Sequence, residues 1–357
     1  MRRTLIVLVG LVLLLAALIL ARLSIGSSGV GWPSGPYATD ILDARQHRLV
    51  LALVVGAALA VSGVALQALL RNPLAEPYVL GLSTGAAVGI MAQSLLVYTL
   101  YFSMAEASDV GQDTVVAAVA PAPTSKVDLP GWVGHHQIGA LAGAMLSVLI
   151  VFMASRRRGV IDPVGLLLTG IVLSTINGAI VLMLNYLVGP GGLRDDLMHW
   201  MMGFLDEDVG RQTVAVVVAL TVAGLFLLLF YAPEMNIATL SEGEALSLGV
   251  HLGRLRTLLL LVASVLAAGA VVLAGPIAFV GLICPHLTRL LLGPRHGTLL
   301  IGSAFVGASL IVLSDLASVL IDLRWKIGLM PIGIFTALVG GPVFLWMLRP
   351  HLGRSME

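Results

Sequence analysis

The sequence predicts an all-α membrane protein, a polytopic bundle of ten transmembrane helices. Of its 357 residues, 58% are hydrophobic and 11% are charged, whereas soluble domains carry about 25% charged residues. Apolar runs of roughly 20 residues, enough to cross about 30 Å of hydrocarbon, recur along the chain. The runs are apolar on every face and too long for barrel strands, which predicts helices. We expect one domain over residues 1–357.

The ten apolar runs follow one another with short connections. They lie at about 4–23, 49–70, 78–101, 137–154, 164–187, 212–231, 255–274, 276–293, 298–321 and 329–348. The first run could instead be a secretory signal peptide, because Arg2 and Arg3 precede an apolar stretch. The seventh and eighth are separated by Gly275-Pro276, a turn signal that could also be a kink within one helix.

The distribution of charge favours ten spans with both termini in the cytoplasm. In that topology, twelve of the 20 basic residues fall on the inner side, and thirteen of the 19 acidic residues fall on the outer side or at its membrane edge. An excess of basic residues on the cytoplasmic side is typical of membrane proteins. A nine-span alternative would move Arg349 and Arg354 outside and weaken this bias.

Three loops differ from the short connections. An outer segment at about 102–136 carries several prolines and acids and predicts an extended loop. A second outer loop, at 188–211, contains an interfacial helix candidate with Trp200 as an aromatic anchor. The inner loop at 232–253 predicts a short helix outside the membrane, with Ser241 and Glu244 as a capping box and Gly249 as its stop. This segment is either a docking helix for another protein or a solvated turn between two spans.

Several chemistries are excluded by missing residues. A single cysteine, Cys284, excludes an internal disulfide, and no Cys/His cluster predicts a metal site. The two lysines, Lys126 and Lys326, do not lie in an ATP-binding motif, and there is no His-Glu dipeptide, so we expect neither ATPase nor zinc protease activity. No basic stripe for nucleic acid occurs. Asp315 and His286 are the candidates for a proton relay, but a hydrogen-bonded helix terminus is the favoured interpretation.

Small residues recur within the predicted spans, and their simplest role is to let helices pack closely. They include Gly56, Ala57, Ala58, Gly63, Gly81, Gly85, Gly89, Gly302 and Gly307.

Several longer motifs follow one another along the chain. They are Arg71-Asn72-Pro73-Leu74-Ala75-Glu76-Pro77, Leu80-Gly81-Leu82-Ser83-Thr84-Gly85-Ala86, Leu167-Leu168-Thr169-Gly170-Ile171, Trp200-Met201-Met202-Gly203, Gly275-Pro276-Ile277-Ala278-Phe279-Val280-Gly281-Leu282, Pro331-Ile332-Gly333 and Gly341-Pro342-Val343-Phe344. With these motifs in consistent order, the chain from about 45 to 348 resembles the FecCD-type permeases, the membrane subunits of bacterial ATP-binding-cassette (ABC) importers for ferric siderophores, haem and cobalamin.

The resemblance implies partners and a mechanism. The permease would form a homodimer in the bacterial inner membrane with its pore at the subunit interface, together with two cytoplasmic ATPase subunits and a periplasmic substrate-binding protein. Substrate would cross by alternating access. The chain itself would be a transport subunit with no permanently bound cofactor, and ATP would be used by the partner. The inner helix would be the coupling helix that docks on the ATPase, through Ser241, Glu242, Glu244, Ala245, Leu248, Gly249 and Val250.

On the outer face, Arg45 and Arg48 match arginines that receive glutamates of the binding protein in similar permeases. Such pairs set orientation and encounter rate more than affinity. The alternative is plain snorkelling at the start of a span. The family's third docking arginine would fall near Val319, so we expect Arg324 or Lys326 to replace it.

The resemblance also implies a cytoplasmic gate and a translocation path. Asp162-Pro163-Val164 occupies the stretch of a small hydroxyl pair in cobalamin-type relatives and implies a bulkier gate. Pore walls would come from the fifth span, with core packing as the alternative for each residue. Candidates are Ser174, Asn177, Met183 and Asn185 in that span, and Met198 and His199 near the outer mouth.

Substrate identity is predicted least directly. His199 and the methionines beside it would offer ligands or a soft surface to haem iron, although interfacial packing explains them equally well. We therefore expect an iron chelate, with haem ahead of a ferric siderophore and cobalamin behind. An ion-coupled secondary transporter is the alternative from another class, because spans 2–5 and 7–10 run in opposite senses, but no intramembrane ion site is visible.

Overall fold

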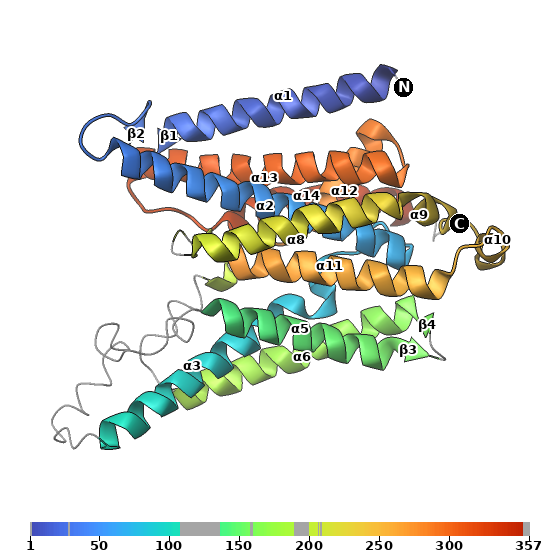
Figure 1. Cartoon of the computed structure of the whole chain (residues 1–357), viewed down its shortest axis with the longest axis horizontal. Helices are drawn as coiled ribbons and strands as arrows, with labels where there is room; N and C mark the ends of the chain where they lie inside the picture. Colours follow the sequence, from blue (N-terminus) through green and yellow to red (C-terminus); the bar gives the residue numbers. More distant parts are fainter. Residues whose placement is uncertain are drawn as a thin grey trace.

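The computed structural model describes residues 2–27, 29–107, 136–157, 160–188, 200–205, 207 and 209–352. They form a bundle of long helices with two short β-hairpins (Figure 1). The elements in order are α1 (Arg2–Ser24), β1 (Ile25–Gly26), β2 (Gly29–Val30), α2 (Ala38–Leu70), the 3-10 helix η1 (Pro77–Leu80), α3 (Leu82–Ala107), α5 (His136–Ser155), β3 (Arg156–Arg157), β4 (Val160–Ile161), α6 (Pro163–Val188), α8 (Arg211–Phe230), α9 (Ala232–Ile237), α10 (Glu242–Ser247), α11 (Leu252–Ala274), α12 (Val280–Leu292), α13 (His296–Trp325) and α14 (Ile332–Leu352).

A helix lies at each of the ten predicted apolar runs. Within the described residues, seven helices are long and apolar enough to cross a membrane, namely α1, α2, α5, α6, α8, α11 and α13. Shorter apolar stretches lie in α3, α12 and α14. The helical membrane architecture is therefore confirmed, whereas the count of ten spans and the side on which the termini lie stay predictions.

Helix α2 is the centre of the bundle and α1 lies at its edge. In their most apolar windows, 83% of the residues of α2 are buried but 6% of those of α1. Helices α11, α12 and α13 surround α2, while α3, α5 and α6 form a second group beside it (Figure 1).

Glycines bring helix backbones into direct contact. Gly63 of α2 lies against α12, where an added Cβ would be 1.9 Å from the carbonyl oxygen of Gly281. The same closeness occurs between α3 and α5, because a Cβ on Gly89 would be 1.9 Å from the carbonyl oxygen of Gly139. Small residues permit such approach in membranes. The predicted packing role of the glycines is confirmed at these positions.

The chain breaks between α11 and α12. Helix α11 ends at Ala274, Gly275 has a positive φ of 65°, and α12 begins at Val280. Gly275-Pro276 therefore separates two helices and does not kink one. The residue before α12, Phe279, also has a positive φ, of 70°.

Side chains from a distant segment satisfy the backbone of this break. The amide of Ile277 donates to the hydroxyl of Tyr78 at 2.9 Å, and the amide of Phe279 donates to the carboxylate of Glu76. Inside a membrane, irregular backbone is tolerated where protein groups pair with it. Two of the motifs quoted above thus meet in space.

Two helix boundaries differ from the prediction. Helix α2 begins at Ala38, well before the apolar run at 49, because the residues ahead of the run continue the helix with buried arginines. Helix α3 continues to Ala107, so the predicted outer loop at 102–136 is helical at its start. Residues 108–135 of that loop lie outside the described residues, and His136 already begins α5.

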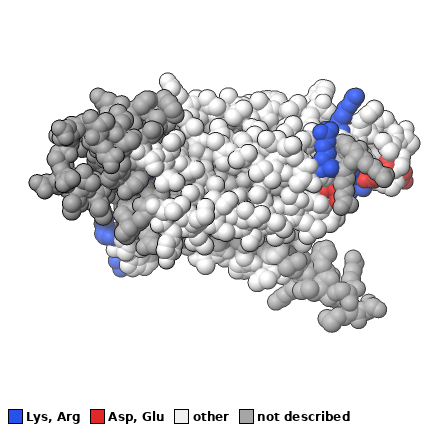
Figure 2. All heavy atoms as spheres, turned by 90° about the horizontal axis from the view of Figure 1, so that it is seen from below, with Lys and Arg blue, Asp and Glu red and all other residues white. Residues whose placement is uncertain are grey.

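The bundle has two distinct ends. We call one the α10 end, where α10, β3 and β4 lie and α1 begins, and the other the β1 end, with β1 and β2 (Figure 1). On the face shown in Figure 2, the coloured charged side chains lie toward the two ends, and the stretch between them is white. An uncharged band between charged ends suits a protein that spans a bilayer.

Candidate functional site

Helix α10 has the start that the sequence predicts. The side chain of Ser241 accepts a hydrogen bond from the amide of Glu244 at 3.3 Å, and the amide of Ser241 donates to the Glu244 carboxylate at 3.0 Å. The helix ends where predicted, at Gly249, whose φ is +82°. Both the capping box and the glycine stop are confirmed.

The orientation of α10 corrects part of the predicted contact surface. Ala245 and Val250 are 0% and 4% exposed and face the bundle, so neither is available to a partner in this structure. Leu246 and Leu248 are 60% and 58% exposed. Leu246 was not among the predicted contact residues, although a leucine within a short helix outside the membrane could have indicated it. The surface of α10 is therefore apolar as well as acidic.

An ion pair ties α10 to the start of α11. Arg256 Nη2 donates to Glu242 Oε1 at 2.5 Å, and the arginine side chain is 11% exposed. This hydrogen bond holds the pKa of Glu242 below its ordinary value, and hydrogen bonds from Ser241 likewise lower the pKa of Glu244. Carboxylates with lowered pKa support the fold above their ordinary pKa and cease to do so as the pH falls through the lowered value. Helix α10 is thus held in place at neutral pH.

Gly249→Ala is expected to loosen the end of α10. An alanine at φ +82° costs about 1–2 kcal/mol, although the space around the position is open. Amide exchange in 242–248 should become several-fold faster, measured by hydrogen–deuterium exchange of the purified protein.

Gly243→Ala is the matched control, because that position is also open but lies within the helix. Alanine there should slow exchange or leave it unchanged. Equal exchange in the two variants would contradict the role assigned to Gly249.

A buried cluster of charges lies toward the β1 end. Asp315 of α13 is 0% exposed and accepts hydrogen bonds from Arg22 Nε of α1 at 2.5 Å and Arg48 Nε of α2 at 2.7 Å. Arg48 also contacts Glu207 at 3.0 Å. Asp315 therefore lies inside a helix and joins three helices, which corrects the expectation of a helix terminus.

The neighbouring Arg45 holds the chain around the first hairpin. Its Nη1 donates to the carbonyls of Leu23 at 2.8 Å and Gly31 at 2.9 Å. Arg45 is 6% exposed and Arg48 is 1% exposed, so in this structure neither guanidinium is presented to a binding protein or snorkels. Arg324, near the end of α13, is exposed. The docking role of the three arginines stays a prediction, and burial does not favour it for the first two.

The predicted gate residues form the start of α6. Asp162 accepts hydrogen bonds from the amides of Gly165 at 3.1 Å and Val164 at 3.3 Å, and Pro163 is the first helical residue. Aspartate before a helix and proline at its first position are typical of helix starts. Val164 is 63% exposed. The gating role stays a prediction.

The predicted path residues on α6 point in different directions. Asn177 is 5% exposed and donates to Ser147 at 3.1 Å and Thr84 at 3.3 Å, so it packs among α3, α5 and α6 and does not line a path here. Ser174 donates back to its own helix, at Gly170. Met183 is 55% exposed, and Asn185 is partly exposed. Met198 and His199 lie outside the described residues.

Among the described residues, no group of three His, Cys, Asp or Glu side chains is arranged to hold a metal ion. Of the predicted site residues, those on α10 and α6 include exposed side chains that a partner could contact.

Comparison with known proteins decides the family. The model of the FecCD transport family matches residues 8–350. The chain belongs to the FecCD transport family. Members similar to it include the cobalamin import system permease BtuC of Halobacterium salinarum, 37% identical over 87% of this chain and 74% of that protein. The hemin transport system permease HmuU of Yersinia pestis is 36% identical over 88% of this chain and 84% of its own length.

A solved structure supports the same assignment. It is described as an inward-facing conformation of a metal-chelate type ABC transporter, and it matches with a TM-score of 0.76 at 27% identity, covering 97% of this chain and 99% of that one. This FecCD protein is therefore a multi-pass membrane permease of an ABC transporter, a transport component and not an enzyme.

Proposed function

We propose that this permease is the membrane subunit of an importer for a large chelate: haem, a ferric siderophore or cobalamin. It would act as a homodimer in the bacterial inner membrane, with two ATPase subunits and a periplasmic binding protein. The observation that carries the proposal is the family match over 8–350 together with the capped helix α10, which exposes two leucines. Relatives named for both cobalamin and hemin support the substrate class.

The haem preference rests on His199 with Met198, Met201 and Met202, of which Met198 and His199 lie outside the described residues. Because relatives are named for both cobalamin and hemin, the three chelates stand as equal candidates. The ten-span topology with cytoplasmic termini belongs to the same proposal. It would place the α10 end in the cytoplasm, where an ATPase can reach it.

In this proposal α10 is the coupling helix. ATP binding would draw the ATPase subunits together, move α10, and switch the side to which the pore between two permease copies opens. The exposed side of α6, with Val164 and Met183, would face the second copy.

Leu246→Ser together with Leu248→Ser should uncouple the transporter. Burying a leucine contributes about 1.5–3 kcal/mol, so two exposed leucines that dock on the ATPase account for at least tenfold in affinity. ATP-dependent uptake should fall at least tenfold, with ATPase pull-down measured alongside.

Ser247→Ala is the control on the same helix, because its exposed hydroxyl bonds to the carbonyl of Glu244 in α10 itself. It should leave uptake unchanged. Normal uptake by the leucine variant would remove α10 from the coupling mechanism.

The function is tested by uptake into proteoliposomes that contain the permease with its ATPase and binding protein. Haem, a ferric siderophore and cobalamin are supplied in parallel, with and without ATP. ATP-dependent uptake of one chelate would support the proposal and identify the substrate. Uptake driven by an ion gradient and indifferent to ATP would refute it in favour of a secondary transporter.

A further inference from the structure

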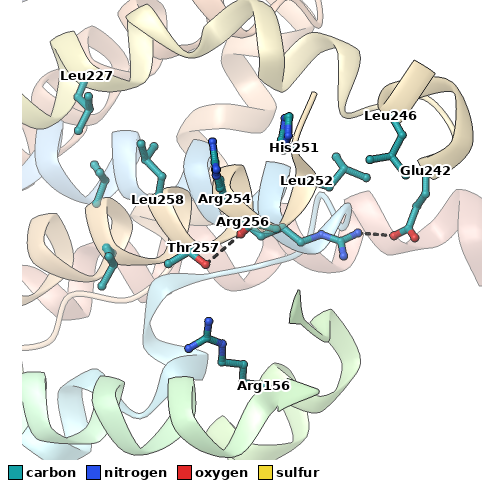
Figure 3. A pocket seen from close by; sticks show the side chains of 13 residues that line it. Arg156, Leu227, Glu242, Leu246, His251, Leu252, Arg254, Arg256, Thr257 and Leu258 are labelled. Atoms are coloured by element: carbon teal, nitrogen blue, oxygen red, sulfur yellow. Dashed lines mark hydrogen bonds and ion pairs between the residues drawn. The ribbon is translucent and has the colours of Figure 1, made fainter. Parts of the chain in front are cut away.

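A groove of about 810 Å³ lies at the α10 end, between the β3–β4 hairpin, α8, α10 and α11 (Figure 3). It is distinct from the buried charge cluster near the β1 end, and none of the predicted gate or path residues lines it. It shares Glu242 with the predicted coupling surface, and Leu246 with the exposed surface of α10.

One part of the groove is cationic. Arg254 and Arg256 line it from the first turns of α11, and Arg156 lines it from β3, on the other side of the groove (Figure 3). Glu242 is the acidic residue of the lining and is paired with Arg256. The structure records no ion pair for Arg156 or Arg254 within its described part. Within the described part, the positive charges of Arg156 and Arg254 are therefore not balanced by a carboxylate, and both residues are exposed.

The other part of the groove is apolar. Leu227 of α8 and Leu258 and Leu261 of α11 line it, and Leu227 and Leu261 are 41% and 47% exposed. Both helices are among those long enough to cross a membrane. Arg254 and Arg256 lie in the first turns of α11, and Leu258 and Leu261 lie further along the same helix. Along α11, the groove therefore changes from cationic to apolar in the direction that leads into the bilayer.

The two parts of the groove complement the two parts of an anionic phospholipid, because the cationic part suits the headgroup and the apolar part suits an acyl chain. Basic pockets between membrane helices at the cytoplasmic side bind anionic headgroups. A free phosphate would use the arginines but would leave the apolar wall uncovered. Arg156 is also oriented by stacking over the ring of Phe152, 5.5 Å from its centroid.

We propose that this groove binds an anionic phospholipid, with the headgroup phosphate between Arg156 and Arg254 and an acyl chain along Leu227, Leu258 and Leu261. The site belongs to the permease itself and requires neither the ATPase nor a transported chelate. The cytoplasmic position of the groove rests on the topology in the proposed function, but lipid retention is measured on the permease alone, so its outcome is distinguishable from that of the uptake experiment.

The test is lipid retention by the purified permease in detergent, measured by native mass spectrometry. Phosphatidylglycerol and phosphatidylcholine with identical acyl chains are the probes. Phosphatidylglycerol should be retained at least tenfold more strongly, since each nearby arginine strengthens binding to an anionic lipid severalfold. The double variant Arg156→Gln/Arg254→Gln should lose this preference.

Arg2→Gln/Arg3→Gln is the matched control, because it removes two exposed arginines at the start of α1, outside the groove. It should keep the preference. Leu261→Trp, which fills the apolar part and leaves the charges intact, should also reduce retention of phosphatidylglycerol.

Equal retention of the two lipids, or the same retention by the groove variants and the control, would overturn the proposal. A third arm adds inorganic phosphate. Displacement of phosphatidylglycerol by millimolar phosphate would show a phosphate site in place of a lipid site and would equally refute the proposal.

Discussion

Asp315→Asn is expected to prevent the accumulation of folded permease. The substitution keeps the shape of the side chain but leaves Arg22 and Arg48, 3% and 1% exposed, facing a neutral group. Removing one partner of a buried ion pair costs about 3–5 kcal/mol. That is a large share of the 5–15 kcal/mol by which proteins are typically stable. The measurement is the thermal unfolding midpoint and the monodisperse fraction in size-exclusion chromatography.

Asp43→Asn is the matched control for Asp315. Asp43 also pairs with an arginine, Arg211, but the two side chains are 53% and 71% exposed. Exposed pairs contribute about 0–1 kcal/mol, so this variant should behave like the wild type. Adding Arg22→Gln to Asp315→Asn should recover part of the loss, because one unpaired charge is removed. A normal midpoint for Asp315→Asn alone would show that the buried cluster does not stabilise the fold.

Gly63→Ala is expected to separate α2 from α12. The new Cβ would lie 1.9 Å from the carbonyl oxygen of Gly281 and 2.5 Å from its carbonyl carbon, and backbone atoms cannot rotate away. Overpacking costs about 1–3 kcal/mol and occasionally more, and a clash between backbones belongs at the upper end. Because α2 is the central helix, we expect a lower yield and a lower unfolding midpoint.

Gly10→Ala tests whether the effect comes from the contact or from glycine itself. Gly10 lies in α1 with open space around it. Alanine there should raise helix stability by about 0.5–1 kcal/mol or leave it unchanged. If both variants unfolded at the same temperature, the close approach of α2 and α12 would not be a stabilising contact.

The sequence predicted features that depend on neighbouring residues. Apolar composition located the helices, and Ser241, Glu244 and Gly249 located both ends of α10 because caps form within a few residues. Tight packing by glycine was also predicted, although the pairs in contact were not.

Pairing between distant spans escaped prediction. Arg48 and Asp315 are 267 positions apart, and composition does not say which helix faces which. The predicted ten-span topology gave one indication of this pairing, because it places Arg22, Arg48 and Asp315 toward the same side of the membrane. The same limit applies to α6, where the residue types of Asn177 and Met183 did not reveal that the first packs inward and the second is exposed.

The separation of Arg48 from Asp315 has a consequence for biosynthesis. At about 5–20 residues per second, Arg48 leaves the ribosome roughly 13–50 s before Asp315, the buried carboxylate with which it pairs. For Arg22, which precedes Asp315 by 293 positions, the interval is slightly longer. During that time the first two helices hold charges that the bilayer interior disfavours, so they must keep these at the water interface. The central helix of the finished protein is thus among the earliest to be made, and its buried ion pair with Asp315 forms only after α13 has been synthesised.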